Sequence, residues 1–138
     1  MYAWHPYPRR HETAKAWFER QVNSGDRVGI PWMSLLAFIR LSTNPRMFER
    51  PVSFESALTQ VHSWLDIPTV WVPEATTRHA RILEELLRGV SFSPNIVGDA
   101  HLAALALEHG LTVCSADSDF AKFPAVRWLN PFQGRSSQ

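Results

Sequence analysis

Residues 97–109 form the segment that most limits how this chain can fold. From Ala100 to Leu107 the side chains are apolar almost all round, and a helix of that kind has to be largely buried. Gly110 predicts the end of the helix, because glycine adopts the left-handed conformation in which many helices end. The run from Thr112 to Cys114 then predicts a short buried strand. A buried helix followed at once by a buried strand indicates a helix packed against a sheet.

The rest of the chain alternates helices with short apolar runs in the same way. Helical periodicity predicts four further helices, over residues 12–24, 34–43, 53–65 and 77–88. Apolar runs predict strands in the sequences RVGI, TVWV, TVCS and VRWL. Ser34 is expected to cap the second helix and Asn95 the last one. This alternation favours one α/β domain on a parallel sheet, over residues 1–132, followed by a flexible tail at 133–138.

Composition narrows the class of protein. The 138 residues carry a formal net charge of +1, so any contact with nucleic acid has to come from a local patch. Cys114 is the only cysteine and has no intramolecular disulfide partner, which favours a reducing compartment. No signal peptide is recognisable, and no apolar run approaches the roughly 18 residues of a membrane span. We therefore expect a cytoplasmic protein that does not associate with membranes.

Three aspartates are expected to meet at one edge of the sheet. Asp99 lies in the first turn of the buried helix, which is about 20 Å long. The chain turns at Gly110, and the following strand returns about 17 Å. The start of the helix and the end of the strand therefore lie at the same edge, where open α/β sheets place their ligands. Asp99, Asp117 and Asp119 should converge there.

Three converging carboxylates repel one another unless a cation lies between them. No Lys or Arg occurs between Asp99 and Lys122, and carboxylate-rich sites suit Mg²⁺ or Mn²⁺. We predict Asp99, Asp117 and Asp119 as metal ligands, and Asp99 and Asp117 as catalytic residues. Each aspartate also has a structural interpretation. Asp99 suits the helix dipole, and the other two suit a turn, with Asp119 as the cap of a short helix at residues 120–123.

Several segments together resemble the VapC family of PIN-domain toxins. The carboxyl-terminal half of these proteins is similar to GDAHLAALALEHG, VCSADSDFAKF and VRWLNPF. Their middle and the segment after their first strand are similar to GIPWMSLLAFIRLSTNPRMF and YAWHPYPRRHETAKAWFE. The resemblance implies a PIN-like three-layer fold with a short parallel sheet flanked by helices. It also implies a Mg²⁺- or Mn²⁺-dependent endoribonuclease that cleaves structured RNA such as transfer or ribosomal RNA, a cognate VapB-like antitoxin, and a homodimer.

Two departures from the family pattern bear on activity. The family opens with a central strand that ends in a DxNxLxYA-like motif, whose Asp is a metal ligand. Here Met1 falls inside that motif and the Asp is missing, so we expect the usual first strand to be absent, through a truncation or a start placed too far downstream. At Ala37 many relatives carry a Glu. These departures favour an alternative, a catalytically impaired PIN-like module that binds antitoxin or RNA without cleavage.

Other residues have both a functional and a structural interpretation. Ser115 could contact metal or phosphate or serve as a turn hydroxyl, and Arg40 could contact phosphate or lie on a helix surface. Trp4 and Trp32, two of six tryptophans, could line a groove for the antitoxin because tryptophan is enriched at interfaces. His101 points about 200° around its helix from Asp99 and is rejected as a ligand of the acidic site. The histidines show no short zinc-binding spacing.

Overall fold

The computed structural model describes residues 2–4, 20, 25–46, 50–115 and 117–130, and for residues 2–4 it describes the backbone alone. Two expectations from the sequence concern residues that the structure does not describe. One is the helix over residues 12–24, of which only Arg20 is described, and the other is the flexible tail at 133–138.

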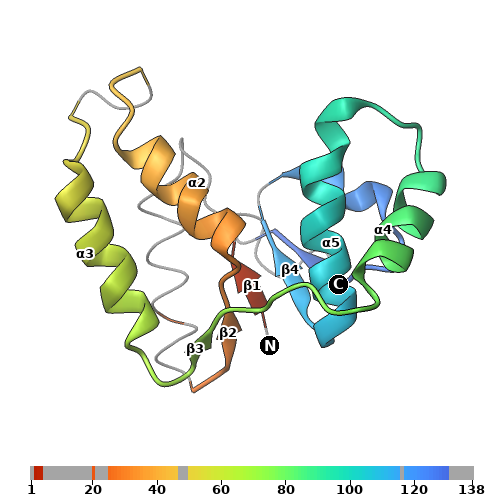
Figure 1. The fold of residues 1–138 in the computed structure, drawn as a ribbon, viewed down its shortest axis with the longest axis horizontal. Coiled ribbons are helices and arrows are strands. Elements are labelled where there is room, and N and C mark those ends of the chain that lie inside the picture. Colours follow the sequence, from red (N-terminus) through yellow and green to blue (C-terminus); the bar gives the residue numbers. More distant parts are fainter. Residues whose placement is uncertain (1, 5–19, 21–24, 47–49, 116, 131–138) are drawn as a thin grey trace.

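Five short parallel strands form one sheet in the order β3-β2-β1-β4-β5 (Figure 1). They are β1 (Tyr2–Trp4), β2 (Val28–Gly29), β3 (Val70–Trp71), β4 (Thr112–Cys114) and β5 (Trp128–Leu129). The four strands predicted from apolar runs are confirmed. The expected absence of a first strand is wrong. The segment before Pro6 is long enough for β1 because every neighbouring strand is itself only two or three residues long.

Within the described residues, two pairs of helices flank the sheet, one pair on each side (Figure 1). One pair is α2 (Trp32–Ser42) and α3 (Phe54–Leu65), and the other is α4 (His79–Arg88) and α5 (Val97–His109). Two short 3₁₀ helices, η2 (Pro94–Ile96) and η3 (Ser118–Lys122), lie before α5 and after β4. This is the three-layer α/β arrangement expected from the sequence.

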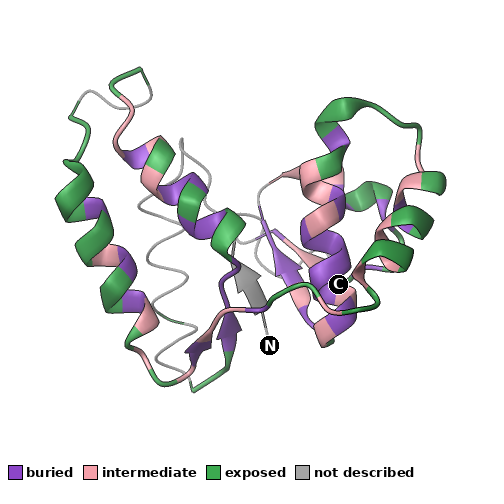
Figure 2. Ribbon diagram, in the orientation of Figure 1, coloured by how far each residue is buried: buried purple, intermediate pink, exposed green. Residues whose placement is uncertain are grey.

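The sheet separates two apolar cores (Figure 2). Consecutive residues of β4 serve opposite cores, because side chains alternate along a strand. Val113 packs with α4 and α5, and Cys114 packs with α2 and α3. In the core beside α2 and α3, the rings of Phe38 and Trp64 meet edge to face with centroids 4.7 Å apart. Both faces of β4 are therefore covered, as parallel sheets require.

The helix limits follow from local chemistry, with two corrections. Ser53 caps α3, since its hydroxyl accepts a hydrogen bond from the Ser56 amide at 3.1 Å. Ser34 does not cap α2: the helix begins at Trp32 after Pro31, whose extended backbone starts it, and Ser34 is buried inside. Asn95 does not cap α5 either, because the preceding turn is already helical at η2.

The limits of α5 are as predicted. It is buried along residues 102–106, and Gly110 ends it with φ of +67°. The Leu111 amide then donates to the Ala106 carbonyl at 2.8 Å, which completes the cap. No helix within the described part of the chain is long and apolar enough to cross a membrane.

Candidate metal centre

The first turn of α5 and the loop after β4 carry the three predicted aspartates to one place. Asp99, Asp117 and Asp119 each offer a carboxylate oxygen, and these oxygens all lie within 4.8 Å of one another. All three side chains are partly buried. Among the described residues no other group of three His, Cys, Asp or Glu side chains converges in this way. The predicted convergence of the aspartates is confirmed as geometry.

Hydrogen bonds within the loop hold Asp117 in position. Its backbone amide donates to the Ser115 hydroxyl at 3.0 Å, and its carboxylate accepts from the Asp119 amide at 2.9 Å. Ser115 is itself fixed, because its carbonyl accepts from the Trp128 indole at 2.8 Å and its amide donates to Leu129 at 3.0 Å. Ser115 is buried, which favours its interpretation as a turn hydroxyl.

The capping residue of the loop is Asp117 rather than Asp119. The structure begins η3 at Ser118, and the Asp117 side chain satisfies the free amide at its start. The structural role that the sequence suggested for Asp119 therefore belongs to its neighbour, and the predicted helix at residues 120–123 begins two residues earlier. Asp119 keeps its carboxylate for other partners. Phe120 anchors the turn, since it is fully buried in the core beneath α5.

The electrostatics of Asp99 show the repulsion that its position implies. Burial, then the negative charges of Asp117 and Asp119 and hydrogen bonds with both, raise the pKa of Asp99 to about 6 from an ordinary value of 3.8. A carboxylate under these conditions gains from a nearby cation. The donor set is all oxygen, which is the set preferred by Mg²⁺ and Mn²⁺. The residues present therefore fit a hard divalent ion.

Lys122 is a residue of the site that the sequence reasoning missed. Its ammonium group lies 3.1 Å from an Asp119 carboxylate oxygen, and the side chains of Lys122 and Asp119 are 56% and 40% exposed. The signal was present as the spacing of three residues, which places two side chains on the same side of a helical turn. Lys122 neutralises part of the acidic charge, so the repulsion is smaller than the sequence alone suggested.

The first turn of α2 lies against the first turn of α5, which carries Asp99. The Met33 methyl carbon lies 2.8 Å from where a β-carbon on Gly98 would stand, so α2 and α5 touch beside Asp99. Trp32 is 47% exposed in this turn. Ala37 is buried and offers no ligand atom.

Two other predicted site residues are not brought to the aspartates by the described contacts. Arg40 is exposed in the last turn of α2, about 12 Å along the helix from its first residue. Trp4 belongs to β1, but its side chain lies outside what the structure describes.

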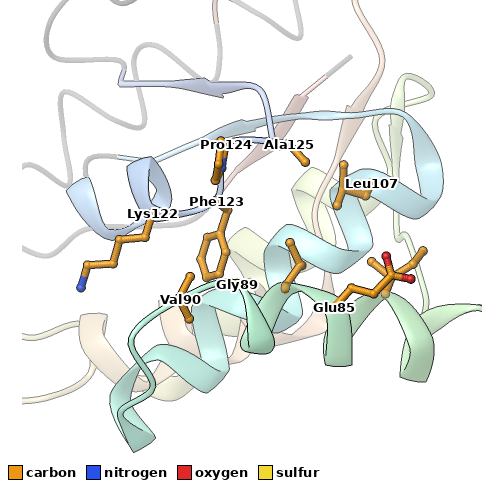
Figure 3. A pocket seen from close by; sticks show the side chains of 10 residues that line it. Glu85, Gly89, Val90, Leu107, Lys122, Phe123, Pro124 and Ala125 are labelled. Carbon is orange, nitrogen blue, oxygen red and sulfur yellow. The ribbon is translucent and has the colours of Figure 1, made fainter.

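An apolar pocket of about 350 Å³ lies beside this centre, between α4, α5 and the segment after η3 (Figure 3). Phe123 and Leu107 line it, with Glu85 and Lys122 as its charged residues. The Lys122 side chain extends away from the other labelled residues (Figure 3). None of the three aspartates lines this pocket, so the acidic cluster is the better candidate for chemistry.

The chain matches the family described as PIN domain over residues 2–126. It is 44% identical to Ribonuclease VapC37 of Mycobacterium tuberculosis over 131 residues, covering 95% of this chain and 91% of the relative. It is 32% identical to Ribonuclease VapC33 of the same species over 124 residues, covering 90% and 87%. The chain belongs to the PIN domain family, and within it to the VapC proteins.

Solved structures of low sequence identity share the fold. A VapBC2 complex of Rickettsia felis bound to promoter DNA matches with a TM-score of 0.63 and 13% identity, over 94% of this chain and 98% of the other. A FitAcB structure from Neisseria gonorrhoeae matches with a TM-score of 0.57 and 16% identity, over 96% and 99%. The PIN-like three-layer fold expected from the sequence is confirmed.

Proposed function

We propose that this chain is the toxin of a type II toxin–antitoxin pair and acts as a Mg²⁺- or Mn²⁺-dependent endoribonuclease on structured RNA. The observation that carries the proposal is the convergence of three carboxylates within 4.8 Å at the carboxyl edge of a parallel sheet. The names of the relatives, which are ribonucleases, support the choice of RNA as substrate.

Asp99, Asp117 and Asp119 are the residues that would hold the ion. When bound, a divalent cation neutralises charge on a phosphate and makes a water molecule more acidic. In the metal-free cluster the pKa of Asp99 is raised to about 6, and a bound cation would hold this carboxyl group in its ionised, ligating form. Asp117 orients the loop through its hydrogen bonds with Asp119 and Ser115. Ser115 and Arg40 remain proposed contacts for phosphate.

The test is cleavage of total bacterial RNA by the purified protein with Mg²⁺ or Mn²⁺, and with a chelator. Asp99→Asn and Asp117→Asn should each abolish cleavage, because each removes a charged ligand while it keeps the shape. Asp66→Asn is the matched control, since Asp66 is an exposed residue at the end of α3, before β3 and thus at the opposite edge of the sheet. Full activity in Asp99→Asn, or activity that survives the chelator, would contradict the proposal.

A binding module without catalysis is the second candidate. It is favoured by Ala37, which is buried and offers no ligand atom on α2, and by β1, whose sequence Tyr2–Trp4 has no acid. Under this alternative the protein binds RNA or an antitoxin but leaves total RNA intact with any divalent ion. Gel-shift and cleavage assays on the same preparation distinguish the two candidates.

An antitoxin partner and a homodimer in the cytoplasm complete the proposal. The titles of the solved structures of similar fold name VapBC2, FitAB and FitAcB, and such two-part names support a partner protein for this chain. The exposed apolar surface of Trp32 and Met33 lies beside Asp99 through the contact with Gly98, which supports a groove for an antitoxin segment, with Trp4 as its other proposed member. Co-expression with the adjacent small open reading frame should give a co-purifying complex, and Trp32→Ala should weaken it. A complex unaffected by Trp32→Ala would remove Trp32 from the groove.

A further inference from the structure

Two histidines from different helices meet on the side of α5 that faces away from Asp99. His79 Nε2 of α4 lies 3.0 Å from His101 Nδ1 of α5. The two rings stand at 70° to each other, with centroids 4.8 Å apart. His101 points about 200° around the helix from Asp99, so the pair is separate from the acidic cluster.

A buried carboxylate determines which His79 nitrogen carries a proton. Glu108 Oε1 accepts from the Thr76 amide at 2.7 Å and from the Thr76 hydroxyl at 2.5 Å, and Oε2 contacts His79 Nδ1. The Glu108 side chain is fully buried. Burial favours a raised pKa, but the hydrogen bonds from Thr76 and His79 outweigh it and lower the pKa of Glu108. The ionised carboxylate can only accept, so His79 donates through Nδ1.

The consequence is a lone pair on the other nitrogen of His79. In the neutral ring, Nε2 is unprotonated and faces His101 Nδ1. Histidines that bind metals usually donate their other ring N–H to a carboxylate, which fixes the tautomer and makes the ligating nitrogen more basic. His79 has this arrangement with Glu108. We propose that His79 and His101 together bind one borderline transition-metal ion, Ni²⁺ or Cu²⁺, through Nε2 and Nδ1. In the metal-free pair His101 Nδ1 carries the proton that it donates to His79 Nε2, and this proton moves to His101 Nε2 when the ion binds.

The spacing of the two nitrogens indicates the kind of ion. At metal–nitrogen distances of about 2.0–2.1 Å, two ligands at right angles are about 2.9 Å apart, and two tetrahedral ligands about 3.4 Å apart. The observed 3.0 Å is close to the right-angle value, which square-planar or octahedral coordination provides. Cu²⁺ and Ni²⁺ prefer such geometry with nitrogen and oxygen ligands. The His79 side chain is 14% exposed, and water molecules would have to fill the remaining positions.

This site differs from the acidic cluster in its ligands and in its effect on the molecule. Imidazole nitrogens select transition metals, whereas carboxylates select Mg²⁺ and Mn²⁺. An ion bound by His79 and His101 would join the first turn of α4 to the second turn of α5. The Arg78 guanidinium already joins the two helices by donating to the Glu108 carbonyl at 2.9 Å. Because the ion binds the folded chain, it should raise the stability of the whole domain.

The experiment uses the full chain with Asp99→Asn and Asp117→Asn already introduced, so that the acidic cluster is removed. Titration with Cu²⁺ chloride should show one ion per chain, and its electron paramagnetic resonance spectrum should show coupling to two nitrogens. Ni²⁺ should raise Tm in the same background. His79→Gln and His101→Gln should each lower the affinity at least about tenfold and remove the increase in Tm, and Glu108→Gln should lower the affinity about 10–100-fold.

His62→Gln is the matched control, because His62 is exposed on α3, on the other side of the sheet, and should leave affinity unchanged. Circular dichroism checks that each variant is folded. The proposal is overturned if the parent chain binds no Cu²⁺ or shows no coupling to two nitrogens, whatever the variants do. It is also overturned if folded His79→Gln and His101→Gln bind the ion as tightly as their parent, since the pair is then only a hydrogen bond between neutral rings.

Discussion

The Lys122 ammonium group lies 3.1 Å from a carboxylate oxygen of Asp119, three residues earlier in η3. The same carboxylate belongs to the cluster that Asp99 and Asp117 complete. Lys122 would therefore compete with a metal ion for the Asp119 carboxylate. An exposed pair of this kind is weak, about 0.2–1 kcal/mol. Lys122 therefore neutralises part of the acidic charge but does not prevent a cation from binding there.

Lys122→Met should accordingly strengthen Mn²⁺ binding by about 1.4- to 5-fold, the range that follows from the strength of an exposed pair. Calorimetry in low salt measures the affinity, and about 0.5 M salt should shrink the difference by screening. Arg81→Met, which breaks the exposed pair with Glu85 on α4, is the control and should have no effect. Weaker Mn²⁺ binding in Lys122→Met would mean that the lysine supports the site.

Asp99→Asn should stabilise the metal-free protein at pH 7.5. The folded state raises the pKa of Asp99 to about 6 from 3.8, so its ionisation above pH 6 opposes folding, and the opposition disappears as the pH falls toward 4. We expect Tm to rise by about 2–6 °C at pH 7.5 and the gain to shrink between pH 6 and pH 4. Asp66→Asn should shift Tm little at either pH. An unchanged or lower Tm in Asp99→Asn would show that the repulsion is already relieved.

Metal affinity should also depend on the ionisation of the Asp99 carboxyl group. Because a bound ion needs the carboxylate form, Mn²⁺ affinity should fall about tenfold between pH 7 and pH 5, given the pKa of about 6 for Asp99. Between pH 7 and pH 8 it should change little. Calorimetry in buffers of different ionisation enthalpy should also detect proton release near pH 6. A constant affinity over the whole range would exclude Asp99 as a ligand.

Phe120 should couple the stability of the fold to the position of Asp119. It is fully buried, and removing such a ring costs about 3–5 kcal/mol. Phe120→Ala should lower the free energy of unfolding by that amount in urea titrations and weaken Mn²⁺ binding, because η3 loses its anchor. Phe120→Leu keeps most of the volume and should affect both quantities much less. Full Mn²⁺ affinity in Phe120→Ala would show that the loop bonds alone position Asp119.

Sequence reasoning predicted the parts of this molecule that local chemistry determines. The limits of α5 follow from its apolar surface and from Gly110, and the approach of Asp99 to Asp117 follows from the lengths of one helix and one strand. The sequence did not identify which aspartate caps η3, because Asp117 and Asp119 suit a turn equally well. The prediction of Asp119 as the cap is therefore wrong. Only the observed bond from the Asp119 amide selects Asp117.

Other features depend on packing between distant segments. His79 and His101 are 22 residues apart, and no short motif joins them, so their contact follows only from how α4 lies on α5. The central strand β1 was missed for a different reason. Three residues are too few to form a recognisable pattern, and they become a strand only because β2 and β4 are present on both sides.

Because α5 ends at the left-handed turn of Gly110, the position of Asp99 in the acidic cluster depends on the number of residues in α5. Asp99 lies eleven positions before that turn, and each position sets both a height and a direction around the helix axis. Loss of one residue from α5 would rotate Asp99 by about 100° and shift it by about 1.5 Å relative to β4, although all three aspartates would still be present in the sequence. Among related chains, insertions and deletions are therefore expected to be rare in this helix. They should occur instead in loops that do not lie between two of the three aspartates.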